Sequence, residues 1–351
     1  MIRIAVACAA LLTFAGSATA KPVSSKPPAL KPIALTNPED LLPLPGGRWV
    51  IASSMAGGPA KSGALYAIDS KTRHVKKIYP AGQPDAAEKP GCGRELASDV
   101  FSAHGVSFRP DAQGGGKLLV VNHGGRESVE IFDLQMGKTS AAAPSLKWDT
   151  CMIAPEGMLQ NSVTSTPDGA IYTTMTSIAS MQEMVKGQAT IGDVRVWTAG
   201  KGWRIVPDSE TWAPNGIIAT PDGGKLYVSA WAGEKILELT LGDKPSRRAL
   251  PLRFSPDNLR WAPDGAILAA GHDRSTTAKI GPCFMSEKAE CPVESLIGRI
   301  DPVAFSVTCT HAMGQTFNTA AVTVGDELWL GAARGVRILR IPASTLTECA
   351  R

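Results

Sequence analysis

The sequence predicts an all-β fold, a six-bladed β-propeller. A turn motif built on Pro-Asp-Gly or a near relative recurs six times, each copy lies between two strand-like runs, and helical periodicity is weak. Proline presets the first turn dihedral and glycine accepts the positive one, so this motif between β-rich runs is typical of hairpins. The turn residues are Pro45, Pro110, Pro167, Pro221, Pro263 and, in the sixth place, Val324. Their spacings of 65, 57, 54, 42 and 61 residues accommodate the roughly 40–50 residues of a four-stranded blade.

The N-terminal segment predicts export. Arg3 is followed by an apolar run from Ile4 to Ala15 and by the small-residue site Ala18-Thr19-Ala20, which is the layout of a cleaved secretory signal. That run is shorter than the roughly 18 apolar residues of a membrane helix, and no later segment reaches this length. We therefore expect a signal peptide (1–20), a Pro-rich N-terminal tether (21–34) and a single propeller domain (35–351) in a secreted or periplasmic protein.

The six units follow one another through the predicted domain. Their inner hairpins are EDLLPLPGGRWVIAS, HGVSFRPDAQGGGKLLVVN, NSVTSTPDGAIYTTM, NGIIATPDGGKLYVSA, DNLRWAPDGAILAAG and NTAAVTVGDELWLGA. One candidate helix, over residues 178–186, is expected as an insertion in the third unit.

Charge and cysteine content narrow the class of protein. The formal net charge is +4 with scattered basic residues, which disfavours nucleic acid as a partner. An even number of cysteines after the signal in an exported chain favours disulfides, and no C-x-x-C pair supports zinc or redox chemistry. We expect Cys283–Cys291 across one loop, together with Cys309–Cys349 and Cys92–Cys151, although sequence alone does not fix the connectivity.

Polar side chains occupy one equivalent place in all six units. Counting back six residues from each turn residue reaches Glu39, His104, Asn161, Asn215, Asp257 and Asn318. The innermost strands of a propeller line its central channel, so equivalent positions meet at one end of it. Asn and Asp also start turns and caps, which explains one or two of these residues but not a complete ring of donors.

The donor types predict a hard cation, calcium. Oxygen ligands without thiolates select hard cations. Calcium takes about six to eight oxygens in flexible geometry, whereas magnesium prefers a strict octahedron. The residues that suit such a ring are Glu39, Asn161, Asn215, Asp257 and the neighbouring Asn258. Two carboxylates and three amides leave coordination open for water or a substrate oxygen, which favours a catalytic site over a purely structural one.

Several motifs resemble a known family. His104-Gly105-Val106-Ser107 is followed by Val120-Val121-Asn122-His123, and Glu39-Asp40-Leu41, Asn215-Gly216-Ile217 and Asp257-Asn258 add further matches. At these residues the sequence resembles the paraoxonase and arylesterase family, within the senescence-marker-protein/gluconolactonase group of six-bladed propellers. The matches extend from about residue 37 to 341, and the paired histidine segments are their specific part.

The resemblance implies roles for particular residues. It places Glu39, Asn161, Asn215, Asp257 and Asn258 on a catalytic calcium site, His104 and His123 on a dyad that activates water, and Asp40 on a second, structural calcium site. The family's Asn-Asp pair is Asn161-Ser162 here, so we expect one calcium ion rather than two. The family's disulfide between the two termini lacks an N-terminal cysteine in the mature chain, so Cys349 has another partner or stays free.

The function predicted is calcium-dependent hydrolysis of small esters or lactones. Histidine suits the general base because its pKa lies near neutrality, although His104 and His123 could instead only line the channel. His272 and His311 are expected to be structural or loop residues. A sugar lactonase is a close variant; the rival is a non-catalytic, calcium-pinned propeller that binds a small ligand or partner protein, and a synthase related to strictosidine synthase is a third possibility. Fold alone does not choose among these.

Overall fold

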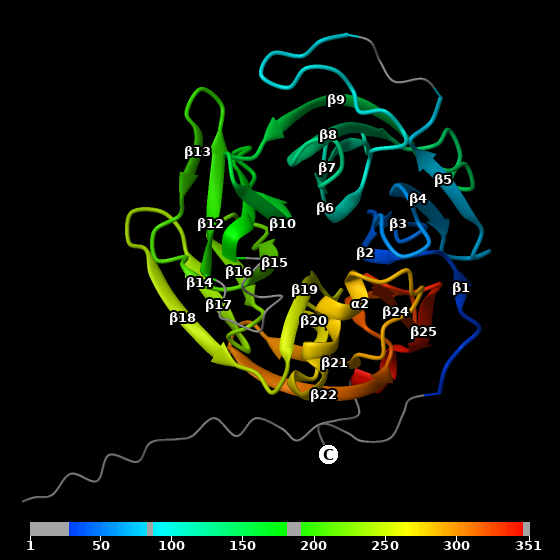
Figure 1. Cartoon of the computed structure of the whole chain (residues 1–351), viewed down its shortest axis with the longest axis vertical. Coiled ribbons are helices and arrows are strands. Elements are labelled where there is room, and N and C mark those ends of the chain that lie inside the picture. The colour runs from blue at the N-terminus through cyan, green and yellow to red at the C-terminus, as the bar shows by residue number, and fades with distance from the viewer. Residues whose placement is uncertain (1–27, 83–86, 181–190, 347–351) are drawn as a thin grey trace, which may run out of the picture.

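The chain folds into six antiparallel sheets arranged around a central axis, which confirms the predicted six-bladed β-propeller (Figure 1). The computed structural model describes residues 28–82, 87–180 and 191–346. The predicted signal peptide and the first half of the predicted tether, residues 21–27, lie outside these ranges. Within them, no helix is long and apolar enough to cross a membrane.

The blades are numbered in the order of their innermost strands along the chain, and the strands of each blade are given from the innermost outwards. Blade 1 contains β2 (Pro38–Pro43), β3 (Trp49–Ser54), β4 (Ala64–Asp69) and β5 (Val75–Tyr79). Blade 2 contains β6 (Ala103–Pro110), β7 (Gly116–Asn122), β8 (Ser128–Gln135) and β9 (Ser145–Ile153). Blade 3 contains β10 (Met158–Ser165), β11 (Ile171–Ser177), β12 (Ile191–Thr198), β13 (Gly202–Ile205) and the short β14 (Thr211–Trp212).

The second half of the chain repeats this plan. Blade 4 contains β15 (Pro214–Ala219), β16 (Lys225–Ala230), β17 (Lys235–Thr240) and β18 (Ser246–Pro251). Blade 5 contains β19 (Ser255–Trp261), β20 (Ile267–His272), β21 (Glu294–Asp301) and β22 (Ser306–Gln315). Blade 6 contains β23 (Asn318–Val324), β24 (Glu327–Ala332), β25 (Arg337–Pro342) and β1 (Ile33–Ala34), and a short 3-10 helix, η2 (Ala343–Leu346), follows it.

The N-terminal strand closes the ring. β1 pairs antiparallel with β25 as the outermost strand of blade 6, and the Leu30 N–H donates to Arg340 O at 2.8 Å. Residues 30–34, at the end of the predicted tether, therefore belong to the propeller. The two ends of the chain thereby share one sheet, which removes a free junction between the first and last blades.

Turn chemistry explains why the inner hairpins form where the sequence predicts them. In blade 3 the Asp168 carboxylate accepts hydrogen bonds from the Thr166 hydroxyl (2.5 Å) and the Ala170 N–H (3.2 Å). Gly169 has a φ of +88°, a conformation that residues with a Cβ adopt rarely. The Thr-Pro-Asp-Gly turn is thus fixed locally, before any contact with another blade.

The core is divided among the interfaces between neighbouring blades. Each of the six interfaces carries its own cluster of buried apolar side chains, contributed by the facing sheets. Between blades 1 and 2, for example, the Tyr79 ring meets the edges of Phe101 and Phe132 at centroid distances of 4.8 and 4.6 Å. Burial on both faces explains why the second strand of a blade, such as β3 or β24, is buried at every position rather than at alternate ones.

A buried carboxylate adds a polar link between blades 6 and 1. Glu327 accepts hydrogen bonds from Arg340, from the Trp329 indole (2.7 Å) and from Arg73 of blade 1 (2.8 Å). Burial alone would raise the pKa of Glu327, but these donors, with Arg340 first, lower it to about 2.

Disulfides fix two loops. Cys92 is bonded to Cys151 and Cys283 to Cys291, as predicted. Cys309 is also disulfide-bonded, but Cys349, the partner we expect, lies outside the described residues.

The Cys283–Cys291 loop belongs to the one helical insertion that the structure describes in full. It carries η1 (Arg274–Lys279) and α2 (Ile280–Phe284) between β20 and β21 and packs on Met55, Phe317 and Ala333. Of the predicted helix over 178–186, residues 178–180 are helical and the rest lies outside the described ranges.

Every inner strand carries a bulge at the same end of the channel. In each of the six blades the pairing of the first two strands shifts register close to the start of the inner strand. Bulges bend a strand locally and re-aim its side chains. Two of the bulges contain Gly105 and Gly216, where an added Cβ would lie 2.7 and 2.4 Å from a carbonyl oxygen of the next inner strand. The small residue lets neighbouring inner strands approach closely.

Candidate metal centre

The six bulges present a ring of side chains at one end of the channel. The residue pairs at the bulges are Glu39-Asp40, His104-Gly105, Asn161-Ser162, Asn215-Gly216, Asp257-Asn258 and Thr319-Ala320. Five of these pairs start with the residue that the sequence predicts.

The sixth position of the ring corrects the sequence prediction. The bulge of blade 6 places Thr319 there, not Asn318. The sixth turn has no proline, and Gly325 rather than Val324 takes the equivalent place, so the count from Val324 ends one residue early. The Asn318 amide is bonded within its surroundings instead, donating to Gly331 O at 3.1 Å and accepting from Thr316 at 2.5 Å.

Direct contacts join the acidic members of the ring to their neighbours. Glu39, which is fully buried, has its Oε1 atom 2.8 Å from Asn258 Nδ2 and 3.3 Å from His104 Nε2. Asp257 is buried on the opposite side of the channel from His104 and forms a side-chain hydrogen bond with Asn215. Residues from blades 1, 2, 4 and 5 are therefore within contact of one another across the channel.

Four oxygens of this ring have no hydrogen-bond partner among the residues that the structure describes. They are Glu39 Oε2, Asn161 Oδ1, Asn215 Oδ1 and Asn258 Oδ1, each buried and without a hydrogen bond. Leaving a buried acceptor unsatisfied costs about 1–3 kcal/mol each, so four in one ring is a set that a bound group would satisfy. All four are carboxylate or amide oxygens, the ligands of hard cations. With Asp257 the ring carries two carboxylates, which fits a divalent cation.

The charges of the ring perturb each other strongly. Burial, and after it the Glu39 carboxylate, raise the pKa of Asp257 well above its usual range. Burial lowers the pKa of His104, but the carboxylates of Glu39, Asp257 and Asp40 outweigh it and raise that pKa to about 9. Both shifts have the sign expected where carboxylates lie close together with too little positive charge. A divalent cation among them would supply that charge.

Asp40 differs from the other predicted ligands because its carboxylate is already paired with an arginine side chain. Its Oδ1 atom accepts from Leu41 N–H (2.8 Å), and its Oδ2 atom accepts from Val106 N–H (2.9 Å) and from the Arg260 guanidinium (2.5 Å). Burial raises the pKa of Asp40 to about 6, and Arg260 opposes the rise. The resemblance placed Asp40 on a second calcium site, but this carboxylate is paired within the chain, and Ser162 supplies no charge beside it. The residues do not fit a second ion.

The two predicted catalytic histidines lie together at the edge of the ring. His104 Nδ1 is 2.6 Å from His123 Nε2, and their rings are tilted by 60° with centroids 4.8 Å apart. His104 lies on β6 at the bulge, and His123 directly follows β7, so one hairpin positions both. The other ring nitrogen of His104 faces Glu39. The pair thus connects the ring of oxygens to the loop after β7.

Comparisons with solved structures agree with this architecture. The fold is similar to a gluconolactonase from Xanthomonas campestris (15% identity, TM-score 0.54, covering 94% of this chain and 99% of that one). It is also similar to regucalcin, a calcium-binding protein from Agrobacterium tumefaciens (12%, 0.53, 91% and 95%), and to a luciferin-regenerating enzyme (13%, 0.56, 89% and 93%). The chain shares the gluconolactonase and regucalcin fold. Neither a family model nor a curated protein matches the sequence, and at these identities the likeness concerns the fold.

His272 is a site residue of this propeller that the sequence analysis missed. His272 in blade 5 is equivalent to His123 in blade 2, because each directly follows the second-strand residue that is paired just before the bulge. Its Nε2 atom lies 3.8 Å from Asp257 Oδ2. Its Nδ1 atom accepts from the Trp231 indole at 3.0 Å, so the proton of the neutral ring is on Nε2. Burial lowers the pKa of His272 to about 3, which keeps the ring neutral.

Counting residues from the hairpin turn would have identified His272 only if the length of each turn were known. The hairpin turn of blade 2 is longer than that of blade 5, so His123 and His272 stand at different distances from their turn prolines. Sequence reasoning also missed Arg260, in the inner hairpin of blade 5, and Glu127, four residues after His123. Neither stands at a position that the repeat marks, and only the folded ring brings them to the site.

Proposed function

We propose that this chain is a hydrolase of lactones or esters that depends on a divalent cation, with calcium as that cation. The observation that carries the proposal is the ring of four buried oxygens without partners, in contact with a histidine pair. The similar folds of a gluconolactonase and of a calcium-binding protein support a lactone substrate and calcium. The paraoxonase-like motifs around His104 and His123 extend the proposal to esters.

The ligands of the cation would be Glu39, Asn161, Asn215, Asp257 and Asn258. Their oxygens come from four blades, and all belong to the class that calcium prefers. When bound, the cation polarises the substrate carbonyl and stabilises the oxyanion that develops on it. The chain contributes the rigid placement of these oxygens, because the bulged inner strands are each hydrogen-bonded into a sheet of four or five strands.

His104 is the residue placed to move the proton. In hydrolysis a water oxygen bonds to the carbonyl carbon, the bond from that carbon to the leaving oxygen breaks, and one proton passes from the water to the leaving oxygen. His104 Nε2 faces the ring beside Glu39, while Nδ1 is held by His123. A cation held by the carboxylates would lower the pKa of His104 from the value of about 9 that they impose, and the unprotonated Nε2 would then accept the proton from water and return it to the leaving oxygen. His123 holds the imidazole in that orientation.

The disulfides support an oxidising compartment outside the cytoplasm. Two disulfides lie within the described residues, and such bonds persist in oxidising environments. Together with the predicted signal at residues 1–20, they support a secreted or periplasmic protein.

The proposal is tested by hydrolysis of phenyl acetate, aliphatic lactones and sugar lactones, with calcium and with a chelator. We expect hydrolysis of at least one class and its loss on chelation. His104→Gln should reduce turnover by roughly 100-fold or more, the scale of a general base, with an unchanged melting temperature. His74→Gln is the matched control, because His74 is exposed on blade 1. Absence of hydrolysis with every substrate, while calcium still binds, would instead support the calcium-pinned binding propeller.

A further inference from the structure

A carboxylate stands at the outer end of the histidine pair. Glu127 lies in the loop between β7 and β8, and its Oε2 and Oε1 atoms are 2.9 and 3.1 Å from His123 Nδ1. His123 Nε2 in turn contacts His104 Nδ1 at 2.6 Å, and His104 Nε2 faces Glu39 at 3.3 Å. The three side chains form a continuous line of contacts from the loop to the ring of oxygens.

We propose that Glu127 is a positioning residue that sets the tautomers of His123 and, through it, of His104. An ionised carboxylate only accepts hydrogen bonds, so His123 donates its Nδ1–H to Glu127. The Nε2 atom of neutral His123 is then an acceptor, and the contact with His104 requires a proton on His104 Nδ1. With Nδ1 held in this way, Nε2, the atom that faces Glu39, is the ring nitrogen of His104 that gains or loses a proton. A proton taken up at that atom would be stabilised by the carboxylate at the other end of the line.

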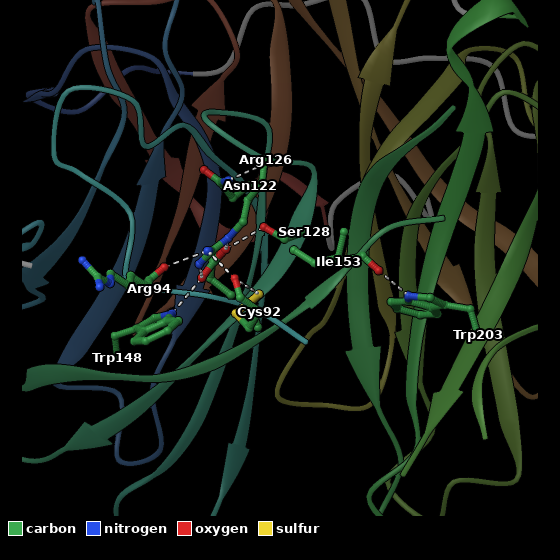
Figure 2. Close-up of a disulfide and its surroundings, with 10 residues drawn as sticks. Cys92, Arg94, Asn122, Arg126, Ser128, Trp148, Ile153 and Trp203 are labelled. Atoms are coloured by element: carbon green, nitrogen blue, oxygen red, sulfur yellow. Dashed lines mark hydrogen bonds and ion pairs between the residues drawn. A yellow bond between two sulfur atoms is a disulfide. The ribbon is translucent and has the colours of Figure 1, made fainter. Parts of the chain in front are cut away.

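The loop that carries Glu127 is held at both of its ends. The Asn122 amide donates to Gly124 O (2.9 Å) and Arg126 O (2.8 Å). The Arg126 guanidinium bonds the buried Glu130 carboxylate and the carbonyl of Cys92, next to the Cys92–Cys151 disulfide (Figure 2). These contacts leave the loop little freedom, so the distances along the line are fixed before any substrate binds.

The second oxygen of Glu127 determines how a glutamine side chain would be oriented at this position. Glu127 Oε1 accepts from the backbone N–H of Gln160 at 2.6 Å, the residue before Asn161 on the inner strand of blade 3. A glutamine at position 127 keeps this bond only with its carbonyl oxygen there, and its NH₂ group then faces His123 Nδ1. The atom nearest to His123 Nδ1, at 2.9 Å, is then a donor, whereas Oε1 at 3.1 Å is already bonded to the Gln160 N–H. This arrangement favours the His123 proton on Nε2, the reverse of the tautomer that the carboxylate imposes.

The test compares wild-type protein, Glu127→Gln and Glu156→Gln in saturating calcium. Glu156 is an exposed carboxylate in the neighbouring loop before β10, so its variant matches the change in charge. Imidazole nitrogen NMR should find His123 protonated at Nδ1 in wild type and in Glu156→Gln, and at Nε2 in Glu127→Gln. A wild-type His123 with its proton on Nε2 would overturn the proposal without any variant, which covers the case that Glu127→Gln does not fold.

The consequence for turnover rests on the proposed function, and the two can fail separately. Glu127→Gln should lower kcat by roughly 10- to 100-fold, the scale for partners that orient a site histidine, with KM and calcium affinity unchanged. If the tautomer reverses while wild type hydrolyses nothing, the proposed function fails and the positioning role stands. If the tautomer reverses and kcat on an accepted substrate is unchanged, or if the tautomer does not reverse, the positioning role is refuted.

Discussion

Removing the cationic side chain of Arg260 should cost the propeller a large part of its stability. Arg260, on β19 of blade 5, donates to Leu41 O (2.9 Å) and Asp40 in blade 1 and to Val106 O (2.8 Å) in blade 2. It therefore joins three blades across the channel, and it is 7% exposed while Asp40 is fully buried. Breaking a buried ion pair by removing one partner costs about 3–5 kcal/mol, because the other charge is left uncompensated.

We expect Arg260→Met to lower the free energy of unfolding by about 3–5 kcal/mol in urea titrations. Adding Asp40→Asn should recover part of this loss, with a coupling of about 0.5–3 kcal/mol in the double-mutant cycle. The loss should shrink as the pH falls and be smallest below about 6, the pKa of Asp40 in the wild-type protein, because without Arg260 the carboxyl takes up its proton at a higher pH and a protonated Asp40 no longer needs the cation. Arg337→Met is the control, since the Arg337–Glu290 pair is exposed and such pairs contribute about 0–1 kcal/mol.

Two results would refute this reasoning. One is a cost for Arg260→Met no larger than that of Arg337→Met. The other is strict additivity in the cycle with Asp40→Asn, which would mean that the guanidinium stabilises the channel only through backbone carbonyls and that Asp40 remains available to a metal ion.

Three further predictions concern pH, redox state and export. The pKa of Glu327 in the folded protein is lowered to about 2 from 4.5, so its stabilising effect is fully present above about pH 4.5 and is lost as the pH falls towards 2. Glu327→Gln should therefore be less stable than wild type at neutral pH and approach the stability of wild type in acid. A difference in stability that stays constant with pH would contradict this. Non-reducing peptide mapping should recover Cys283 linked to Cys291 and not as free thiols. N-terminal sequencing of exported protein should start at or near Lys21, whereas a retained Met1 would contradict the predicted cleavage.

The fold was predictable because its signals are local. Each Pro-Asp-Gly turn fixes its own hairpin through bonds within a few residues, as Thr166 and Asp168 show, and six hairpins of similar spacing specify the number of blades. Closure by β1 was not predictable, since Ile33–Ala34 resembles the rest of an extended Pro-rich segment until β25 is beside it.

The site was predictable where it follows the repeat and not where it depends on contacts across the ring. Glu39, His104, Asn161 and Asn215 stand at one distance from their turns, so counting found them. Arg260 carries no such pattern, because its partners lie more than 150 residues away in the sequence. A sequence also shows that Asp40 is acidic but not which cation neutralises it.

The most direct test of the central claim is to measure calcium binding to wild type and to Asp257→Ala. Calorimetric titration gives the affinity, and the melting temperature is compared in calcium and in a chelator. We expect one tightly bound calcium ion per chain in wild type. Calcium should raise the melting temperature, since an ion that binds only the native state stabilises it by about 4 kcal/mol at a thousandfold excess over Kd. Asp257→Ala should lose most of this affinity and most of this shift. A wild-type protein whose melting temperature is the same in calcium and in chelator, with no heat of binding, would contradict the account, and two equally tight ions would contradict the assignment of Asp40 to Arg260.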